Sequence, residues 1–134
     1  MKLILPLLKL NVQTKNKRIY SNLLVANIIN GNKIYGELDN QPSNKVNVQR
    51  TFGMAILSHD KEKDIINANV QFYDDKISAN IFNKLTTGEY VLQPKISVRE
   101  ENITSDNDNN LIKKYSIISF SAIPKHLSSQ FNDN

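Results

Sequence analysis

The chain has 134 residues, which is the size of one domain, and 40% of them are apolar, which excludes global disorder. It has no cysteine, which excludes a disulfide framework and a thiolate zinc site. The 17 basic and 13 acidic side chains give a net charge of +4 but are spread along the chain, a pattern that does not favour nucleic acid as a partner.

The N-terminal third predicts a strand, a helix and a second strand. Residues 3–11 are apolar between polar neighbours, and we expect a buried strand there and not a signal peptide. Ser21 is placed to cap a helix, and Gly31 to end it. A short strand is predicted over residues 33–38. The predicted helix has one apolar face, formed by Leu24, Val25, Ile28 and Ile29.

The middle of the chain predicts a loop followed by two strands. Residues 39–49 are rich in turn formers, and a strand is expected over residues 51–58. His59 falls in the polar connection after it, where we expect a solvated turn residue. Residues 65–72 alternate apolar and polar side chains, which is typical of a half-buried antiparallel strand.

A second helix and another extended segment come next. Asp74 or Asp75 can cap the helix, and Gly88 can end it. Residues 90–99 are predicted to be extended. Pro94 lies within them and lacks a backbone N–H, so this strand is expected at an edge or a bulge.

The chain is predicted to end with a loop over residues 100–110, a strand over residues 115–123 and a flexible tail over residues 125–134. Residues 1–124 then form one domain. The fold class is α+β: a small antiparallel β-barrel or sheet of about six to seven strands with two short helices. No apolar run approaches the roughly 20 residues of a membrane span.

Blocks of sequence in this order and spacing resemble the prohead (capsid maturation) proteases of tailed bacteriophages, whose fold is related to that of the herpesvirus assemblins. The first block is NKRIY at residues 16–20, and the second is GELD at residues 36–39. The third combines LTTG at residues 85–88 with YVLQPK at residues 90–95, and the last is ISFSAIP at residues 118–124. The resemblance covers nearly the whole chain and implies a prohead-protease-like fold.

The chain departs from the family at both catalytic positions. Where the family has its catalytic histidine after GELD, this sequence has Asn40, with Gln41 before Pro42. Gln93 stands where the resemblance places the nucleophilic serine, and Lys95 replaces an arginine. A carboxamide can neither attack nor accept the proton, and losing one such residue costs a serine protease on the order of 10⁶ in kcat. The resemblance therefore implies a vestigial site with no catalytic residue, no metal and no cofactor, formed by Glu37, Asp39, Asn40, Gln93 and Lys95. An ordinary strand end with an Asn-rich turn is the alternative interpretation of GELDNQP.

The expected function is that of a noncatalytic bacteriophage virion protein. It would be an auxiliary or decoration capsid protein that binds the major capsid protein, with homo-oligomerisation also considered. Its expected location is the virion, and the host cytoplasm during assembly, without a membrane. The candidate contact elements are the edge near Pro94, the loop 39–49 and the tail 125–134.

Two alternatives come from other classes of protein. One is an active maturation protease with an unusual site that uses Ser97 or another hydroxyl together with His59. The other is a small barrel that binds single-stranded nucleic acid by stacking Tyr and Phe rings on the bases. His126, in the predicted tail, is expected to be exposed, and the two histidines do not have the spacing of a metal site.

Overall fold

Apolar residues at alternate positions form the strands of one curled sheet. The structure is a computed structural model that describes residues 1–39, 45–103 and 110–128. The strands are β1 Lys2–Lys9, β2 Arg18–Tyr20, β3 Lys33–Glu37, β4 Thr51–Asp60, β5 Ile65–Phe72, β6 Tyr90–Ile103 and β7 Asn110–Pro124. Two α-helices, α1 Val25–Ile29 and α2 Lys76–Thr86, and two turns of 3₁₀ helix, η1 Val48–Arg50 and η2 Lys125–Leu127, complete the described chain.

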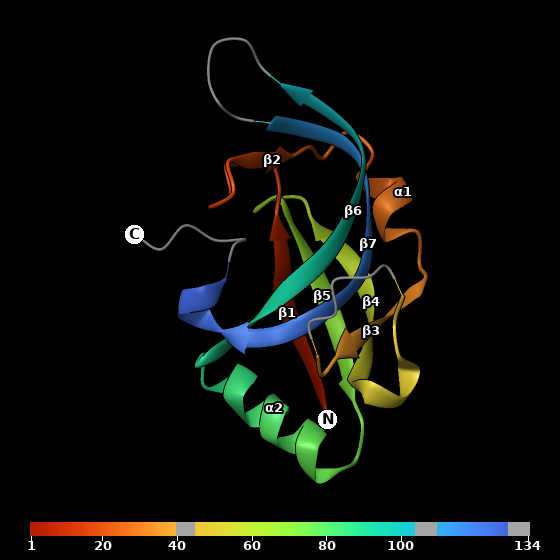
Figure 1. The fold of residues 1–134 in the computed structure, drawn as a ribbon, viewed down its shortest axis with the longest axis vertical. Helices are drawn as coiled ribbons and strands as arrows, with labels where there is room; N and C mark the ends of the chain where they lie inside the picture. The colour runs from red at the N-terminus through yellow and green to blue at the C-terminus, as the bar shows by residue number, and fades with distance from the viewer. Residues whose placement is uncertain (40–44, 104–109, 129–134) are drawn as a thin grey trace.

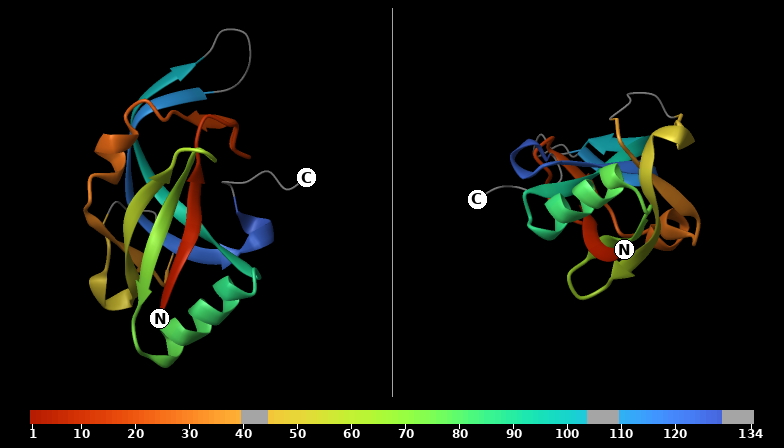
Figure 2. Two further views of the ribbon diagram at one scale, coloured as in Figure 1. Left: turned by 180° about the vertical axis from the view of Figure 1, so that it is seen from behind. Right: turned by 90° about the horizontal axis from the view of Figure 1, so that it is seen from below.

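The strand order is β1-β5-β4-β3-β7-β2, with β6 also paired to β7. The first four strands in this order are antiparallel neighbours, as is the pair β6–β7, whereas β2 and β3 both run parallel to β7. The predicted α+β class, with about six to seven strands and two short helices, is confirmed by the seven strands and two α-helices observed, and the sheet is mixed where an antiparallel one was expected. Figures 1 and 2 show the sheet curling into a half-barrel with α2 at its lower end.

Aromatic rings fill the interior of the curl. Phe52 of β4 stacks on Phe72 of β5 at 5.8 Å and meets Phe120 of β7 edge-on at 5.7 Å between ring centroids. Phe82 of α2 contacts Phe72 edge-on at 5.2 Å, and this contact attaches the helix to the sheet. Edge-on and offset pairs of this kind add about 0.5–1.5 kcal/mol each to the free energy of burial.

The helix ends follow the predicted capping residues in part. Asp75 caps α2 by accepting a hydrogen bond from the Ser78 amide at 2.7 Å, and Gly88 follows the helix with a φ of +81°. The prediction for Ser21 was wrong. α1 is only five residues long, and Leu24 is its N-cap. The Ser21 hydroxyl instead accepts a hydrogen bond from the Leu23 amide, within the turn before the helix.

Two predicted boundaries were wrong because strands continue through polar sequence. β4 continues to Asp60, which places His59 in a strand instead of a turn. β6 continues to Ile103 and β7 begins at Asn110, so residues 100–103 and residue 110 of the predicted loop lie in a β ladder, while residues 104–109 lie outside the described chain. The end of this ladder projects beyond the rest of the sheet (Figure 1). A strand in such a position needs no apolar face, so the hydropathy of the sequence does not predict it.

β6 is an edge strand, and part of the predicted tail is structured. Within the described residues β6 pairs with β7 alone, so Pro94 lies on an edge strand as predicted. Part of the predicted tail, residues 125–127, forms η2, and Ser128 after it is buried. Residues 129–134 lie outside the described chain. Neither helix in the described chain has the length and apolar character that crossing a bilayer requires.

Candidate functional site

The GELD stretch ends β3 and lies level with the predicted nucleophile position on β6. Glu37 is in register with Ser121 of the intervening strand β7, and Ser121 is in register with Gln93 of β6. Two residues along the same ladder, Ser119 of β7 is in register with Lys95. β3 and the consecutive strands β6 and β7, which are distant from it in sequence, therefore bring these side chains together.

A buried polar cluster lies at this junction. The Lys95 Nζ is 2.8 Å from the Glu37 Oε1, and the Ser119 hydroxyl donates a hydrogen bond to the same carboxylate oxygen. Glu37 is 4% exposed, the Lys95 side chain 14% and Ser119 0%. We call these three residues the Glu37 cluster. Its charges neutralise each other, and its carboxylate is satisfied from within the protein.

Packing explains why the first residue of GELD is glycine. A Cβ at Gly36 would lie 2.6 Å from the Phe52 ring and 2.8 Å from the Phe120 ring, both of them in the core. Its partner across the ladder is Gly53, where a Cβ would come within 2.4 Å of the Gln71 backbone oxygen. The glycine lets two aromatic rings pack directly on β3, so the beginning of the motif has a structural role.

Asp39 does not join the Glu37 cluster. Its carboxylate forms an ion pair with the Arg50 guanidinium at the end of η1, on the exposed surface. The hydrogen bond from Arg50, assisted by the charge of Arg50, holds the pKa of Asp39 below its usual value, against the opposing effect of desolvation. Asp39 therefore joins β3 to the segment that precedes β4.

The structure thus brings together part of the predicted site. Glu37 and Lys95 form an ion pair, and Gln93 is half-buried in the same cross-strand row as Glu37. Asn40 lies outside the described residues, so its convergence with Gln93 stays a prediction. The sequence analysis missed Ser119. Its signal was the alternation of serine with apolar residues in ISFSA, which places two hydroxyls on the side of β7 opposite Phe120.

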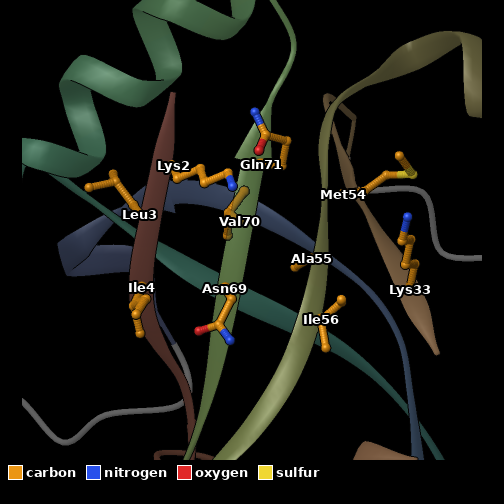
Figure 3. Close-up of a pocket in the computed structure, with 10 residues that line it drawn as sticks. All are labelled: Lys2, Leu3, Ile4, Lys33, Met54, Ala55, Ile56, Asn69, Val70 and Gln71. Atoms are coloured by element: carbon orange, nitrogen blue, oxygen red, sulfur yellow. The ribbon is translucent and has the colours of Figure 1, made fainter. Parts of the chain in front are cut away.

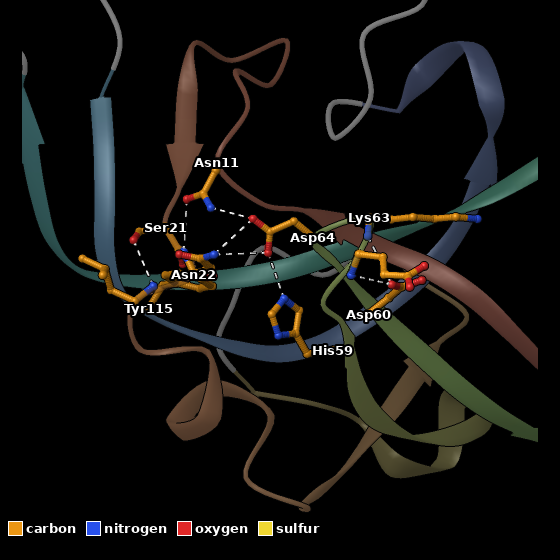
Figure 4. A network of polar contacts seen from close by, with 10 residues as sticks. Asn11, Ser21, Asn22, His59, Asp60, Lys63, Asp64 and Tyr115 are labelled. Atoms are coloured by element: carbon orange, nitrogen blue, oxygen red, sulfur yellow. Dashed lines mark hydrogen bonds and ion pairs between the residues drawn. The ribbon is translucent and has the colours of Figure 1, made fainter.

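His59 lies far from this junction. Thr51 is the residue of β4 in register with Glu37, and His59 is eight residues further along the same strand, roughly 27 Å away at strand rise. The interpretation of His59 as a solvated turn residue was also wrong. Its side chain is 12% exposed, and its Nε2 lies 2.8 Å from the Asp64 Oδ1 (Figure 4).

Asp64 is the centre of a second polar network. The Asn11 side-chain amide donates to its carboxylate at 2.6 Å, and the Asn22 amide donates at 3.1 Å (Figure 4). Burial would raise the pKa of Asp64, but hydrogen bonds from His59, Asn11 and Asn22 outweigh it and hold the pKa below its ordinary value. The network ties the β4–β5 turn to the segments that follow β1 and β2.

A buried tyrosine lies beside this network. The Tyr115 hydroxyl donates to the Ser21 carbonyl at 3.0 Å (Figure 4), and burial raises the pKa of Tyr115 well above its ordinary value. This tyrosine stays protonated and acts as a hydrogen-bond donor that joins β7 to the chain after β2. The side-chain contact that His59 makes in the described chain is with the Asp64 carboxylate, which anchors the ring to the β4–β5 turn.

These elements define a prohead-protease-like fold. A solved structure to which the chain is similar is that of the capsid assembly protease of bacteriophage T4, gp21, with a TM-score of 0.66 and 14% sequence identity. The match covers 90% of this chain and 79% of that chain. No family model and no curated protein sequence matches the chain. At this identity the similarity is one of fold.

Proposed function

We propose that this chain is a noncatalytic structural protein of a bacteriophage capsid, an auxiliary or decoration subunit that has a prohead-protease-like fold and binds the major capsid protein. The observation that carries the proposal is the closed, buried Glu37 cluster at the place where the resemblance puts the catalytic centre. Virion and assembling capsid are its proposed locations, with the vestigial site formed by Glu37, Asp39, Asn40, Gln93 and Lys95.

The chemistry of the cluster supports the noncatalytic part of the proposal. Serine hydrolysis needs a hydroxyl that a substrate can reach and a base that takes its proton. Ser119 is fully buried, and its proton is donated to Glu37. The Lys95 Nζ lies 2.8 Å from the Glu37 Oε1, so it is already engaged by the carboxylate.

The fold supports the capsid context, because the similar T4 protein is by its title a capsid assembly protease. A fold alone does not determine function, and the buried Glu37 cluster supplies the second support. A protein that kept this fold and lost its nucleophile and base would retain surfaces for contacts with capsid subunits. This combination favours a binding role over catalysis.

The test is co-assembly with the major capsid protein encoded in the same genome. We expect the full-length chain to be retained on purified particles at a fixed copy number relative to capsid subunits, measured by quantitative mass spectrometry. Absence of the chain from mature particles would contradict the proposal. A control particle assembled without the chain gives the background.

The protease alternative is tested in the same reaction. No hydrogen bond joins Ser97 to His59 in the described part of the chain, and no cleavage of capsid or scaffold proteins is expected. Specific cleavage that disappears in Ser97→Ala would establish the alternative and refute the noncatalytic role.

The nucleic-acid alternative requires rings that bases can reach. Phe52, Phe72 and Phe120 are buried in the core, and Tyr20 packs edge-on against Tyr115 in the interior at 5.1 Å. Base stacking needs an exposed ring face. These five rings therefore give no support to a stacking surface.

A further inference from the structure

The outer face of the sheet carries an ordered set of side chains where β1, β5, β4 and β3 lie side by side. One cross-strand row begins with Lys2, Gln71 and Met54, in that order. The next row consists of Ile4, Asn69, Ile56 and Lys33. We call these seven residues the outer face (Figure 3).

The outer face is apolar at its flanks and uncovered. Ile4 is 70% exposed and Ile56 is 44% exposed, and both adjoin a hollow of about 830 Å³ (Figure 3). Neither described helix covers these side chains. An exposed apolar hollow on a soluble domain is typical of an interaction site.

A row of amides runs along the middle of this surface. Asn67, Asn69 and Gln71 occupy alternate positions of β5, so successive amides lie about 6.7 Å apart. No hydrogen bond joins these three side chains to any other residue of the described chain. Each amide offers donors and an acceptor, and an extended peptide repeats its own backbone groups at the same two-residue spacing. A helix has no such repeat.

The positive charges of the outer face favour an acidic partner. Lys2 and Lys33 lie on opposite flanks, one row apart, and the side chains that line the hollow include no carboxylate. Neither lysine forms an ion pair within the described residues. A second copy packed face to face would bring lysine against lysine, which is unfavourable. A partner segment with acidic side chains at both lysines is complementary.

We propose that the outer face binds an extended acidic segment of a partner protein. Its peptide groups hydrogen-bond to Asn69 and Gln71, and its successive side chains alternate between the two flanks. As the segment runs along β5, its successive side chains meet Lys2, Met54, Ile4 and Lys33 in turn. The matching order of side chains in the segment is acidic, apolar, apolar, acidic. The proposal depends on this surface alone and is independent of the capsid role.

The test uses two synthetic ten-residue peptides and the full chain. One peptide carries a central Asp-Leu-Val-Glu, and the other carries Lys-Leu-Val-Lys. We expect the acidic peptide to cause saturable NMR shifts at the methyl groups of Ile4, Met54 and Ile56. The lysine peptide should cause none. The affinity should fall when salt is raised from about 20 to about 200 mM, because the ion pairs are exposed.

Two variants probe the charges and the amides separately. K2E/K33E should reverse the preference, so that the lysine peptide binds and the acidic one does not. The matched control K61E/K63E makes the same charge change on exposed lysines of the β4–β5 turn and should leave binding unchanged. Asn69→Ala combined with Gln71→Ala removes two hydrogen-bonding side chains and should weaken binding about tenfold or more.

Several results would overturn the proposal. They are equal binding of both peptides, shifts confined to another surface, and an unchanged preference in K2E/K33E. Concentration-dependent shifts of the same methyl groups without peptide would show that a second copy occupies the face. Shifts of these groups by a single-stranded oligonucleotide and not by the acidic peptide would assign the face to nucleic acid.

Discussion

Replacing Lys95 by methionine tests whether the Glu37 cluster is a closed structural unit. The variant removes the ammonium that lies 2.8 Å from the Glu37 Oε1 and leaves a carboxylate that is 4% exposed with the Ser119 hydroxyl as its remaining partner in the cluster. Breaking a buried ion pair from one side costs about 3–5 kcal/mol. Because the Lys95 side chain retains 14% exposure, water can partly solvate the site, and we expect the lower end, about 3 kcal/mol.

This loss corresponds to a measurable shift in melting temperature. For 134 residues the entropy of unfolding is about 0.28 kcal/mol/K near the midpoint, so a loss of about 3 kcal/mol lowers Tm by about 11 °C. Chemical denaturation followed by circular dichroism gives the free energy of unfolding, and calorimetry gives Tm. The control Lys125→Met changes an exposed lysine of η2 and should stay within about 0.5 kcal/mol of the wild type.

A double-mutant cycle separates the ion pair from packing. Glu37→Met combined with Lys95→Met removes both charges and leaves the Ser119 hydroxyl without its acceptor, a penalty of about 1–3 kcal/mol. We therefore expect the double variant to be about as stable as K95M or more stable, with strongly non-additive single effects. Additive effects, or a loss below about 1 kcal/mol for Lys95→Met alone, would refute the view of the cluster as a buried, mutually satisfied unit.

Two further predictions concern the motif glycine and the second network. Gly36→Ala should lower the free energy of unfolding by about 1–3 kcal/mol, since its Cβ would overlap the Phe52 and Phe120 rings, and a denaturation midpoint unchanged from wild type would contradict the packing role. Asp64→Asn should lose about 1.5–3 kcal/mol at neutral pH, because three side chains hydrogen-bond to this carboxylate. The lowered pKa of Asp64 means that its contribution is present above the ordinary value of 3.8 and is lost as pH falls through the lowered pKa. The gap between variant and wild type, followed by urea denaturation, should therefore narrow at acid pH, and a gap that widens there would contradict the assignment.

Local patterns in the sequence predicted most of the elements but few of their partners. The alternation over residues 65–72 gave β5, and Asp75 and Gly88 gave both ends of α2, because capping and alternation depend on neighbours in sequence. The parallel pairing of β3 with β7 was not predictable in this way. It joins segments more than 80 residues apart, and nothing in either strand specifies the direction of the other.

The residues of the candidate site were also predicted only in part. The resemblance placed Glu37 and Lys95 in one site, and the structure joins them in an ion pair. It did not include Ser119, because the alternation in ISFSA places Ser119 and Ser121 on one side of the strand but does not show which residue of another strand lies against them. His59 was misjudged since the polar sequence after it looks like a turn, although the strand continues and Asp64 holds the ring.

The Glu37 cluster connects three strands of the sheet. Glu37 and Lys95 belong to β3 and β6, which do not pair with each other but flank β7 on opposite sides. Their ion pair therefore crosses the intervening strand and ties its two neighbours together, with Ser119 of that strand bonded to the same carboxylate. A serine introduced at Gln93 would find the nearby ammonium already engaged by Glu37, and the nearest described histidine of the sheet at the far end of β4. If the proposed function is correct, charges at this junction now stabilise the sheet, and interactions with partners depend on the exposed surfaces.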